Sequence, residues 1–393
     1  MNKRNFLRAT AALVASAVLG MGGALGIADA QAQQGPIKIG SFLAVTGPAS
    51  FLGDPEAKTL RLYVDTVNKA GGVNGRQLQA VIYDSAGDAR QAVTFARRLI
   101  EEDKVDIIVG GSTTGETMAV VPLAEEAQIP FISLAGANVI VEPVKKWVFK
   151  MPHSDRMAVE KIYEDMKKNG KTKAAVLGGS GGFDQSCRKE AKDLAPKYGI
   201  TVIADETYAA TDTDMTVQLT KIKNTAGVDS IVGCGFGAPT AITARNYRQL
   251  GMQNIQFYFN HGVGSQQFID GAGGGAEGMR VPVAALLVAD QLAANDPQKK
   301  VAEDYTRAYR AANNNEPVST FGGHMYDGFM IAIEAMKRAG GTDKAKVRDE
   351  IEKTRGFVGA DGLYNMSATD HMGLTLDSFK MVEIRNNTWK LLY

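Results

Sequence analysis

Short apolar segments alternate with helical segments along most of this chain. Residues 37–43, 78–84 and 106–110 are apolar and strand-like, and residues 56–71 and 88–103 between them have helical periodicity. Continuous apolar runs are typical of strands that are buried on both faces of a parallel sheet. Strands that alternate with helices form such sheets, because a helical crossover joins one parallel strand to the next. The sequence therefore predicts an α/β fold with parallel sheets covered by helices.

The alternation falls into two blocks, roughly residues 37–150 and 173–285. A chain of 393 residues is long enough for two domains, so we expect two α/β lobes. Gly, Ser, Thr and Asn are frequent where the strands end, and open α/β sheets bind ligands at the carboxyl ends of their strands. Such loops on two facing lobes would surround a common cleft. Residues 379–393 predict a terminal hairpin that turns at Asn386 and Asn387.

The N-terminal residues differ from the rest of the chain. Three basic residues precede an apolar stretch from Ala11 to Ile27, and small residues follow it. This order is typical of a secretory signal peptide, here residues 1–32 with cleavage after Ala30 or Ala32. A membrane anchor is the alternative, but the apolar stretch is short and rich in glycine. We therefore expect a mature protein outside the cytoplasm.

The charges of the chain nearly cancel, with 44 Lys and Arg against 43 Asp and Glu. This balance lacks the basic excess of nucleic-acid-binding proteins, so we expect no nucleic-acid partner. The four histidines are isolated from one another and from the cysteines, which predicts no metal site and no cofactor. Cys187 and Cys234 either form a disulfide or remain two buried thiols, and the sequence leaves both possibilities open.

The stretch GGSTTGETM, residues 110–118, follows an apolar strand and opens a helix. Backbone NH groups at a helix N-terminus attract anions, and Ser112, Thr113 and Thr114 add hydroxyl donors. A Walker phosphate loop requires a lysine, which this stretch lacks. Neutral donors suffice for one carboxylate, so the loop predicts a carboxylate site. The alternative is that these hydroxyls only cap the helix.

A second glycine-rich stretch, GGSGG at residues 178–182, also lies between a strand and a helix. It matches the G-x-S-x-G pattern of a nucleophile elbow, which would make Ser180 the nucleophile of a hydrolase. His324 or His371 follows in the chain order that such an enzyme requires. Short Gly/Ser strings are common at strand–helix turns, however. We therefore expect no enzyme and no catalytic residue, and keep the hydrolase as an alternative.

Longer motifs occur in order along the chain: TGPASFLG (46–53), NKAGGVNGRQLQAVIYDSAGDARQAVTFARRLI (68–100), VGGSTTGETMAV (109–120) and AEGM (276–279). With the export signal, they make the chain resemble the periplasmic solute-binding proteins of the branched-chain amino acid class of ABC importers, a class with members for aromatic acids. The resemblance implies a monomeric, non-enzymatic receptor in the periplasm. Its partners would be a small carboxylate and the permease subunits in the inner membrane. A sensor with the same fold is an alternative.

The same resemblance implies the type I periplasmic-binding-protein fold. This fold has two Rossmann-like lobes with parallel sheets, joined by three crossover strands, and it traps its ligand by hinge closure. The first lobe would comprise residues 36–152 and 286–377. The second lobe would comprise residues 153–285 and 378–393.

In this family, the loop after the third strand and the end of the next strand hold the carboxylate of the ligand. Carried over, Thr114 is the best match for the hydroxyl contact, and Ala135 and Ala137 match the others, with Gly136 between them. Ala137 stands where the amino-acid binders carry a threonine, so one hydroxyl is lost. The residues that we expect to compensate are Ser112, Thr113 and Ser133.

The second lobe departs from the amino-acid binders, which hold the ammonium of the ligand with two tyrosines and an acidic residue. The tyrosine positions fall on Phe183 and Phe236, and the acidic position falls on His261. An ammonium without a carboxylate partner is costly in a closed cleft. We therefore expect a ligand that has no α-amino group.

The expected ligand is a small carboxylate with an aromatic or apolar body, such as a benzoate, a hydroxybenzoate, a cinnamate or a branched 2-oxo acid. Phe183 and Phe236 would pack against it, with Phe51 or Leu52 from the first lobe, and His261 would hydrogen-bond a distal polar group. The alternative is that the two phenylalanines only pack the lobes and that His261 lies on a surface loop. Branched-chain amino acids, amides and urea are alternative ligands.

Overall fold

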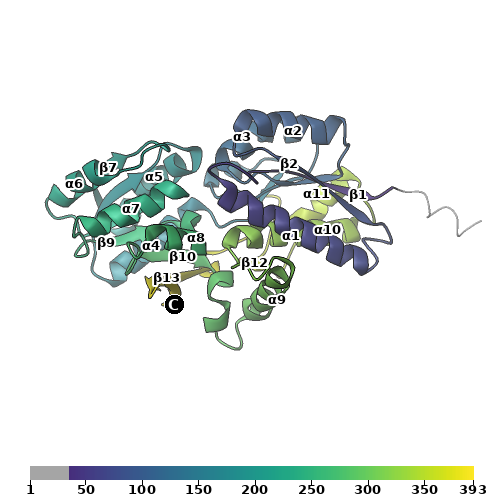
Figure 1. The fold of residues 1–393 in the computed structure, drawn as a ribbon. Helices are drawn as coiled ribbons and strands as arrows, with labels where there is room; N and C mark the ends of the chain where they lie inside the picture. The colour runs from purple at the N-terminus through teal and green to yellow at the C-terminus, as the bar shows by residue number, and fades with distance from the viewer. Residues whose placement is uncertain (1–34) are drawn as a thin grey trace, which may run out of the picture. The chain divides into compact units, whose positions relative to one another are not determined.

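The computed structural model describes residues 35–393, so the predicted signal peptide, residues 1–32, lies outside the described residues. Residues Ile37–Tyr393 form one compact unit. Within the described range, no helix combines the length and the apolar character that a membrane crossing needs. The architecture is α/β with two lobes, each built around its own sheet, as the sequence predicts (Figure 1).

The first sheet consists of five parallel strands in the order β2-β1-β3-β4-β5. They are β1 (Ile37–Leu43), β2 (Leu78–Asp84), β3 (Ile107–Gly110), β4 (Phe131–Ser133) and β5 (Val148–Lys150). Successive residues of a strand point to opposite faces, so Ile107 and Val109 join the core on one face and Ile108 joins the core on the other. Because both faces are buried, the strands read as continuous apolar runs.

Helices cover both faces of the first sheet. α1 (Ser50–Lys69) and α10 (Thr320–Ala339) pack on one face, and α2 (Ala89–Glu101) and α3 (Thr114–Glu126) pack on the other. α9 (Pro297–Ala312) contacts α1, and α11 (Lys344–Glu352) contacts α10. α1 begins before the expected residue 56 and continues through Pro55.

The second sheet has seven strands in the order β14-β13-β10-β9-β8-β6-β7. Its parallel strands are β6 (Lys173–Gly178), β7 (Thr201–Thr207), β8 (Ser230–Cys234), β9 (Gln256–Phe259) and β10 (Arg280–Ala284). The helices on one face are α4 (Asp155–Lys168) and α5 (Gly182–Leu194). The helices on the other face are α6 (Thr216–Asn224), α7 (Ala238–Gln249) and α8 (Gln266–Ala272).

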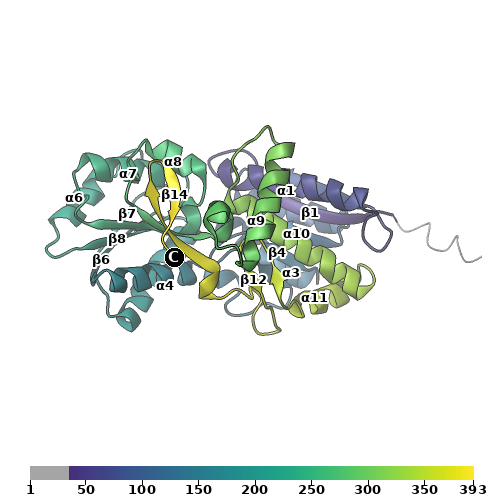
Figure 2. The same cartoon turned by 90° about the horizontal axis from the view of Figure 1, so that it is seen from below.

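The chain ends in the predicted hairpin, which is coloured yellow in Figure 2. β13 (Phe379–Arg385) and β14 (Thr388–Leu391) pair antiparallel with each other, and β13 pairs antiparallel with β10. Asn386 and Asn387 have φ angles of 52° and 56°. Two-residue turns that join antiparallel strands need positive φ at both positions, and asparagine tolerates this better than most residues. The hairpin prediction is therefore confirmed.

Three connections join the two sheets. The chain leaves β5 for α4, leaves β10 for η4 (Ala285–Gln291) and α9, and returns through η5 (Leu376–Ser378) to β13. They match the three crossovers that the family resemblance implies, whereas the lobe boundaries at residues 152, 285 and 377 stay a prediction. The remaining short elements are η1 (Asn138–Ile140), η2 (Ala195–Tyr198), η3 (His261–Val263), β11 (Phe357–Val358) and β12 (Leu363–Tyr364).

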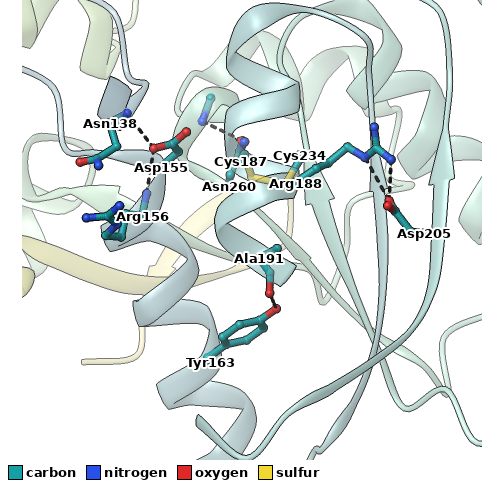
Figure 3. The surroundings of a disulfide bond; sticks show 11 residues. Asn138, Asp155, Arg156, Tyr163, Cys187, Arg188, Ala191, Asp205, Cys234 and Asn260 are labelled. Atoms are coloured by element: carbon teal, nitrogen blue, oxygen red, sulfur yellow. Dashed lines mark hydrogen bonds and ion pairs between the residues drawn. A yellow bond between two sulfur atoms is a disulfide. The ribbon is translucent and has the colours of Figure 1, made fainter. Parts of the chain in front are cut away.

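A disulfide joins Cys187 of α5 to Cys234 at the end of β8 (Figure 3). Their Cα atoms are 5.6 Å apart, and both side chains are fully buried. The structure thus selects one of the two possibilities that the sequence leaves open. The bond ties the N-terminal half of α5 to the loop after β8, and Phe183 and Phe236 lie on these two segments.

Candidate functional site

A pocket is lined by residues of both lobes. Eight of the residues predicted as ligand contacts line it, namely Leu52, Ser112, Thr113, Thr114, Gly136, Phe183, Phe236 and His261. Five further residues complete the lining: Leu134, Pro152, Gly262, Phe321 and His324. The remaining predicted contacts, Phe51, Ser133, Ala135 and Ala137, do not line this pocket.

The N-terminus of α3 opens onto the pocket through Thr113 and Thr114. Thr113 caps the helix, because its Oγ1 accepts a hydrogen bond from the backbone NH of Glu116 at 3.2 Å. In return, the Glu116 carboxylate accepts one from the backbone NH of Thr113 at 3.0 Å. This reciprocal capping box fixes the start of the helix. The first-turn NH groups of Thr114 and Gly115 have no acceptor within the helix.

Thr114 differs from the other hydroxyl residues of the loop. Its Oγ1 is buried and has no hydrogen-bond partner among the described residues. A buried hydroxyl without a partner is unfavourable unless a ligand supplies one. Thr114 is therefore the side chain of this loop that is free to serve a ligand, whereas the capping alternative describes Thr113.

Ser112 and Ser133 were expected to replace the lost hydroxyl at position 137, but both have other partners. Ser112 Oγ donates to Glu56 Oε2 at 2.5 Å and accepts from the backbone NH of Ala44 at 3.0 Å. Ser133 Oγ pairs with Thr117 Oγ1 at 2.9 Å and accepts from the backbone NH of Ala135. Both hydroxyls are therefore already hydrogen-bonded within the protein, although Ser112 lines the pocket.

Phenylalanine rings form the apolar wall of the pocket. The centroids of Phe183 and Phe236 lie 6.0 Å apart, and Phe51 lies 6.0 Å from Phe236 and 5.5 Å from Phe321. Phe51 itself lines a neighbouring pocket on the side of α7 and α8. The Cys187–Cys234 disulfide holds the two segments that carry Phe183 and Phe236 against each other.

His261 lies in the pocket, not on the surface loop of the alternative interpretation. It is 7% exposed, and neither of its ring nitrogens makes a hydrogen bond. Burial lowers the pKa of His261 well below its usual value, and the nearby Lys150 and His324 lower it further, whereas the backbone of His153 acts weakly in the opposite direction. The imidazole is therefore neutral. A Cβ atom on Gly136 would lie 2.8 Å from its Nε2, so the close approach requires glycine there.

His324 reaches the pocket from α10 and is buried. Its Nδ1 is hydrogen-bonded to Asp361 Oδ2. Burial lowers the pKa of His324 to about 3, and the neighbouring Lys150 acts in the same direction. Asp361 is itself held by Asp327, whose carboxylate accepts from the backbone NH groups of Ala360 and Asp361 at 2.7 and 2.9 Å. The Asp361 side chain thus fixes the orientation of the His324 ring.

Lys150 lies close to these histidines but does not line the pocket. Its side chain is fully buried, and its Nζ donates to the carbonyl oxygen of Pro152. Burial lowers the pKa of Lys150 to about 7, and Asp155 and Asp361 oppose this shift. No aspartate or glutamate is among the lining residues in the part of the chain that the structure describes.

The chain matches the periplasmic binding protein family over residues 36–387. It belongs to this family. The leucine-, isoleucine-, valine-, threonine- and alanine-binding protein of Pseudomonas aeruginosa is 29% identical over 317 residues, which cover 80% of this chain and 82% of that protein. An extracellular ligand-binding receptor from Rhodopseudomonas palustris HaA2 is 29% identical, with a TM-score of 0.85 over 91% of this chain and 100% of the other.

A further structural relative is the branched-chain amino acid transporter substrate-binding protein LivJ from Streptococcus pneumoniae, solved in complex with isoleucine. It is 26% identical, with a TM-score of 0.78 over 91% of this chain and 99% of its own. The present chain is thus a periplasmic binding protein that is similar to solute-binding proteins of the branched-chain amino acid type.

In this periplasmic binding protein, Ser180 lies apart from the pocket. Its side chain is exposed, and it borders a surface hollow together with Gln185 and Arg188. Within the described residues, no hydrogen bond joins Ser180 to a histidine, and His371 is hydrogen-bonded instead to the Val148 carbonyl. The structure therefore gives the hydrolase alternative no support.

Phe321 and His324 line the pocket but are not among the ligand contacts that the sequence predicts. They lie one turn apart on α10, a helix whose apolar pattern indicates only core packing. The available signal was the pair of titratable residues, His324 and Asp327, in the mainly apolar stretch TFGGHMYDGFM. A polar side chain in such a stretch needs a buried partner, and Asp361 supplies it from a distant loop.

Proposed function

We propose that the protein binds a small carboxylate with an aromatic or apolar body in this pocket. It acts as a monomer in the periplasm, after cleavage of the signal peptide behind Ala30 or Ala32, and it delivers the ligand to the permease in the inner membrane. Lobe 1, with the loop at the start of α3, receives the carboxylate. Both lobes contribute to the apolar wall, lobe 1 with Leu52 and Phe321 and lobe 2 with Phe183 and Phe236.

The observation that carries this proposal is the unpartnered Thr114 hydroxyl beside the free NH groups of α3. A carboxylate is the small group that accepts several such hydrogen bonds at once, and the helix dipole adds a favourable charge interaction. The rings of Phe183, Phe236 and Phe321 then surround an apolar body. Aromatic rings prefer tilted or offset contacts at centroid separations of about 4.5–7 Å, and Phe183 and Phe236 already form such a contact at 6.0 Å.

An α-ammonium group would lack a partner in the same pocket. Within the described residues, no carboxylate side chain lines this pocket. The imidazoles of His261 and His324 do line it, and they are neutral because burial lowers their pKa values. Burying an unpaired cation costs far more than one hydrogen bond returns. The lining therefore favours acids without an amino group.

Branched-chain amino acids are the second candidate ligands, because two relatives carry them in their names. The Pseudomonas aeruginosa protein is named for binding leucine, isoleucine, valine, threonine and alanine, and the Streptococcus pneumoniae structure contains isoleucine. Amides and urea are further candidates for a pocket without charged side chains. The lining residues argue against the ammonium of an amino acid but not against neutral amides.

A thermal-shift screen of unfolded and refolded protein tests the proposal, since refolding removes ligand that survives purification. The panel compares benzoate, 4-hydroxybenzoate, cinnamate and 2-oxoisocaproate with leucine, isoleucine, urea and acetamide. A ligand at 100 times its Kd adds about 2.7 kcal/mol to the unfolding free energy. We expect shifts with acids alone. A shift with leucine and none with any acid would refute the ligand class and leave the receptor role intact.

A further inference from the structure

The pocket contains two imidazoles that a simple carboxylate does not use. His261 has two ring nitrogens without a hydrogen bond although the side chain is buried. His324 has its Nδ1 on Asp361, and the rest of its ring faces the pocket. They come from η3 and α10, whereas the predicted carboxylate site is on α3.

These two histidines are held together by the backbone. Thr320, in the first turn of α10, donates from its NH and its Oγ1 to the carbonyl oxygen of Gly264, at 3.2 Å each. Gly264 directly follows η3, which carries His261. In this structure, the hydrogen-bonded contact between Thr320 and Gly264 therefore holds the segment that carries His261 beside the helix that carries His324.

We propose that His261 and the His324–Asp361 pair recognise a hydroxyl group on the ring of the ligand, so that the preferred substrates are hydroxylated aromatic acids. This inference rests on the proposed function, because it assumes that an aromatic carboxylate occupies the pocket. It assigns His261 and His324 as specificity-determining residues and Asp361 as a positioning residue.

A hydroxyl fits these groups better than the alternatives do. It donates and accepts, so it pairs with a neutral imidazole in either tautomer. A second carboxylate would need a charged partner here, and protonating His324 is unfavourable at neutral pH because burial lowers its pKa to about 3. An unsubstituted ring would leave buried ring nitrogens without partners. Sites built to hydrogen-bond a hydroxyl discriminate strongly against analogues that lack it, for this reason.

Matched ligand pairs on the wild-type protein give the first test. Calorimetry would compare benzoate with 3- and 4-hydroxybenzoate, and cinnamate with 4-hydroxycinnamate. We expect at least one hydroxylated acid to bind about 10-fold or more tightly than its unsubstituted parent. Equal affinities within every pair would overturn the inference and leave the proposed function standing. If neither member of any pair binds, the proposed function fails as well.

Variants then locate the recognition. His324→Leu should remove most of the hydroxyl increment, which is the ratio of the affinities for the hydroxylated and the unsubstituted acid. His371→Leu is the matched control, because His371 is also buried but bonds to the Val148 carbonyl outside the pocket. It should keep the full increment. An increment that survives in His324→Leu and in His261→Leu would overturn the assignment.

A fourth variant keeps the assignment testable if His324→Leu does not fold. Asp361→Asn keeps a hydrogen-bonding group against Nδ1 but changes the proton arrangement of the pair. A merely structural role would alter the affinity for both members of a ligand pair equally. We expect instead a change in their ratio, and an unchanged ratio would contradict the positioning role of Asp361.

Discussion

Thr114→Val tests the carboxylate site with a very small change of shape. Valine keeps the branched Cβ atom and nearly the same volume but lacks the hydroxyl. Thr114 Oγ1 has no partner in the protein, so the ligand is the group that it would serve. A hydrogen bond to a charged acceptor contributes about 1.5–3 kcal/mol. At about 1.4 kcal/mol for each tenfold change, the Kd for benzoate should rise about 10- to 150-fold.

The same substitution should not weaken the ligand-free fold. A buried hydroxyl without a partner is a cost of folding, so its removal should leave the unfolding free energy unchanged or raise it by about 1 kcal/mol. Thr117→Val is the control one turn along the helix. Thr117 Oγ1 is hydrogen-bonded to the Gly111 carbonyl at 3.2 Å and to Ser133 Oγ at 2.9 Å. The loss of this hydroxyl should lower the unfolding free energy by about 1–3 kcal/mol and change the affinity for the acids little.

Calorimetry with benzoate and 4-hydroxybenzoate would measure the affinities of both variants, and urea unfolding would measure their stabilities. The expected result is a crossed pattern, in which Thr114→Val loses affinity and Thr117→Val loses stability. Unchanged affinity of Thr114→Val for every acid that binds the wild type would refute the carboxylate site on α3.

Three further changes test other parts of the site. Gly136→Ala places a methyl group 2.8 Å from His261 Nε2, so the affinity for each acid should fall about 10-fold, and an unchanged titration would contradict the close packing. Asp184 has its pKa raised from 3.8 to about 6, chiefly by burial, so the native state binds its proton more tightly. Stability should therefore fall by about 3 kcal/mol as the pH rises from about 4 through 6, and urea unfolding of Asp184→Asn should lack this fall. Replacing Cys187 and Cys234 together by alanine removes a disulfide that closes a loop of 47 residues. We expect the unfolding free energy, measured with urea, to fall by about 2–4 kcal/mol and ligand binding to weaken. Wild-type stability together with wild-type affinity would contradict a role of the disulfide in holding the site.

The local sequence was sufficient for the architecture. Alternating apolar strands and amphipathic helices require parallel sheets covered on both faces, and Asn386-Asn387 between two strand-like runs requires a tight hairpin. The loop GGSTTGETM likewise indicated a helix start, and α3 begins within it, at Thr114. These features are encoded in neighbouring residues because backbone periodicity and turn conformation depend on nearest neighbours.

The roles of individual side chains depended on partners that lie far away in the chain. Ser112 and Thr114 are both hydroxyl residues of the same loop. Ser112 donates its hydrogen bond to Glu56, whereas the Thr114 hydroxyl has no hydrogen-bond partner among the described residues. His324 reaches the pocket because α10 packs on the first sheet and Asp361 orients its ring. Sequence thus determined the fold and the family of this binding protein. Only the tertiary structure decided which polar groups remain free for a ligand, because long-range packing decides which hydrogen bonds are already made.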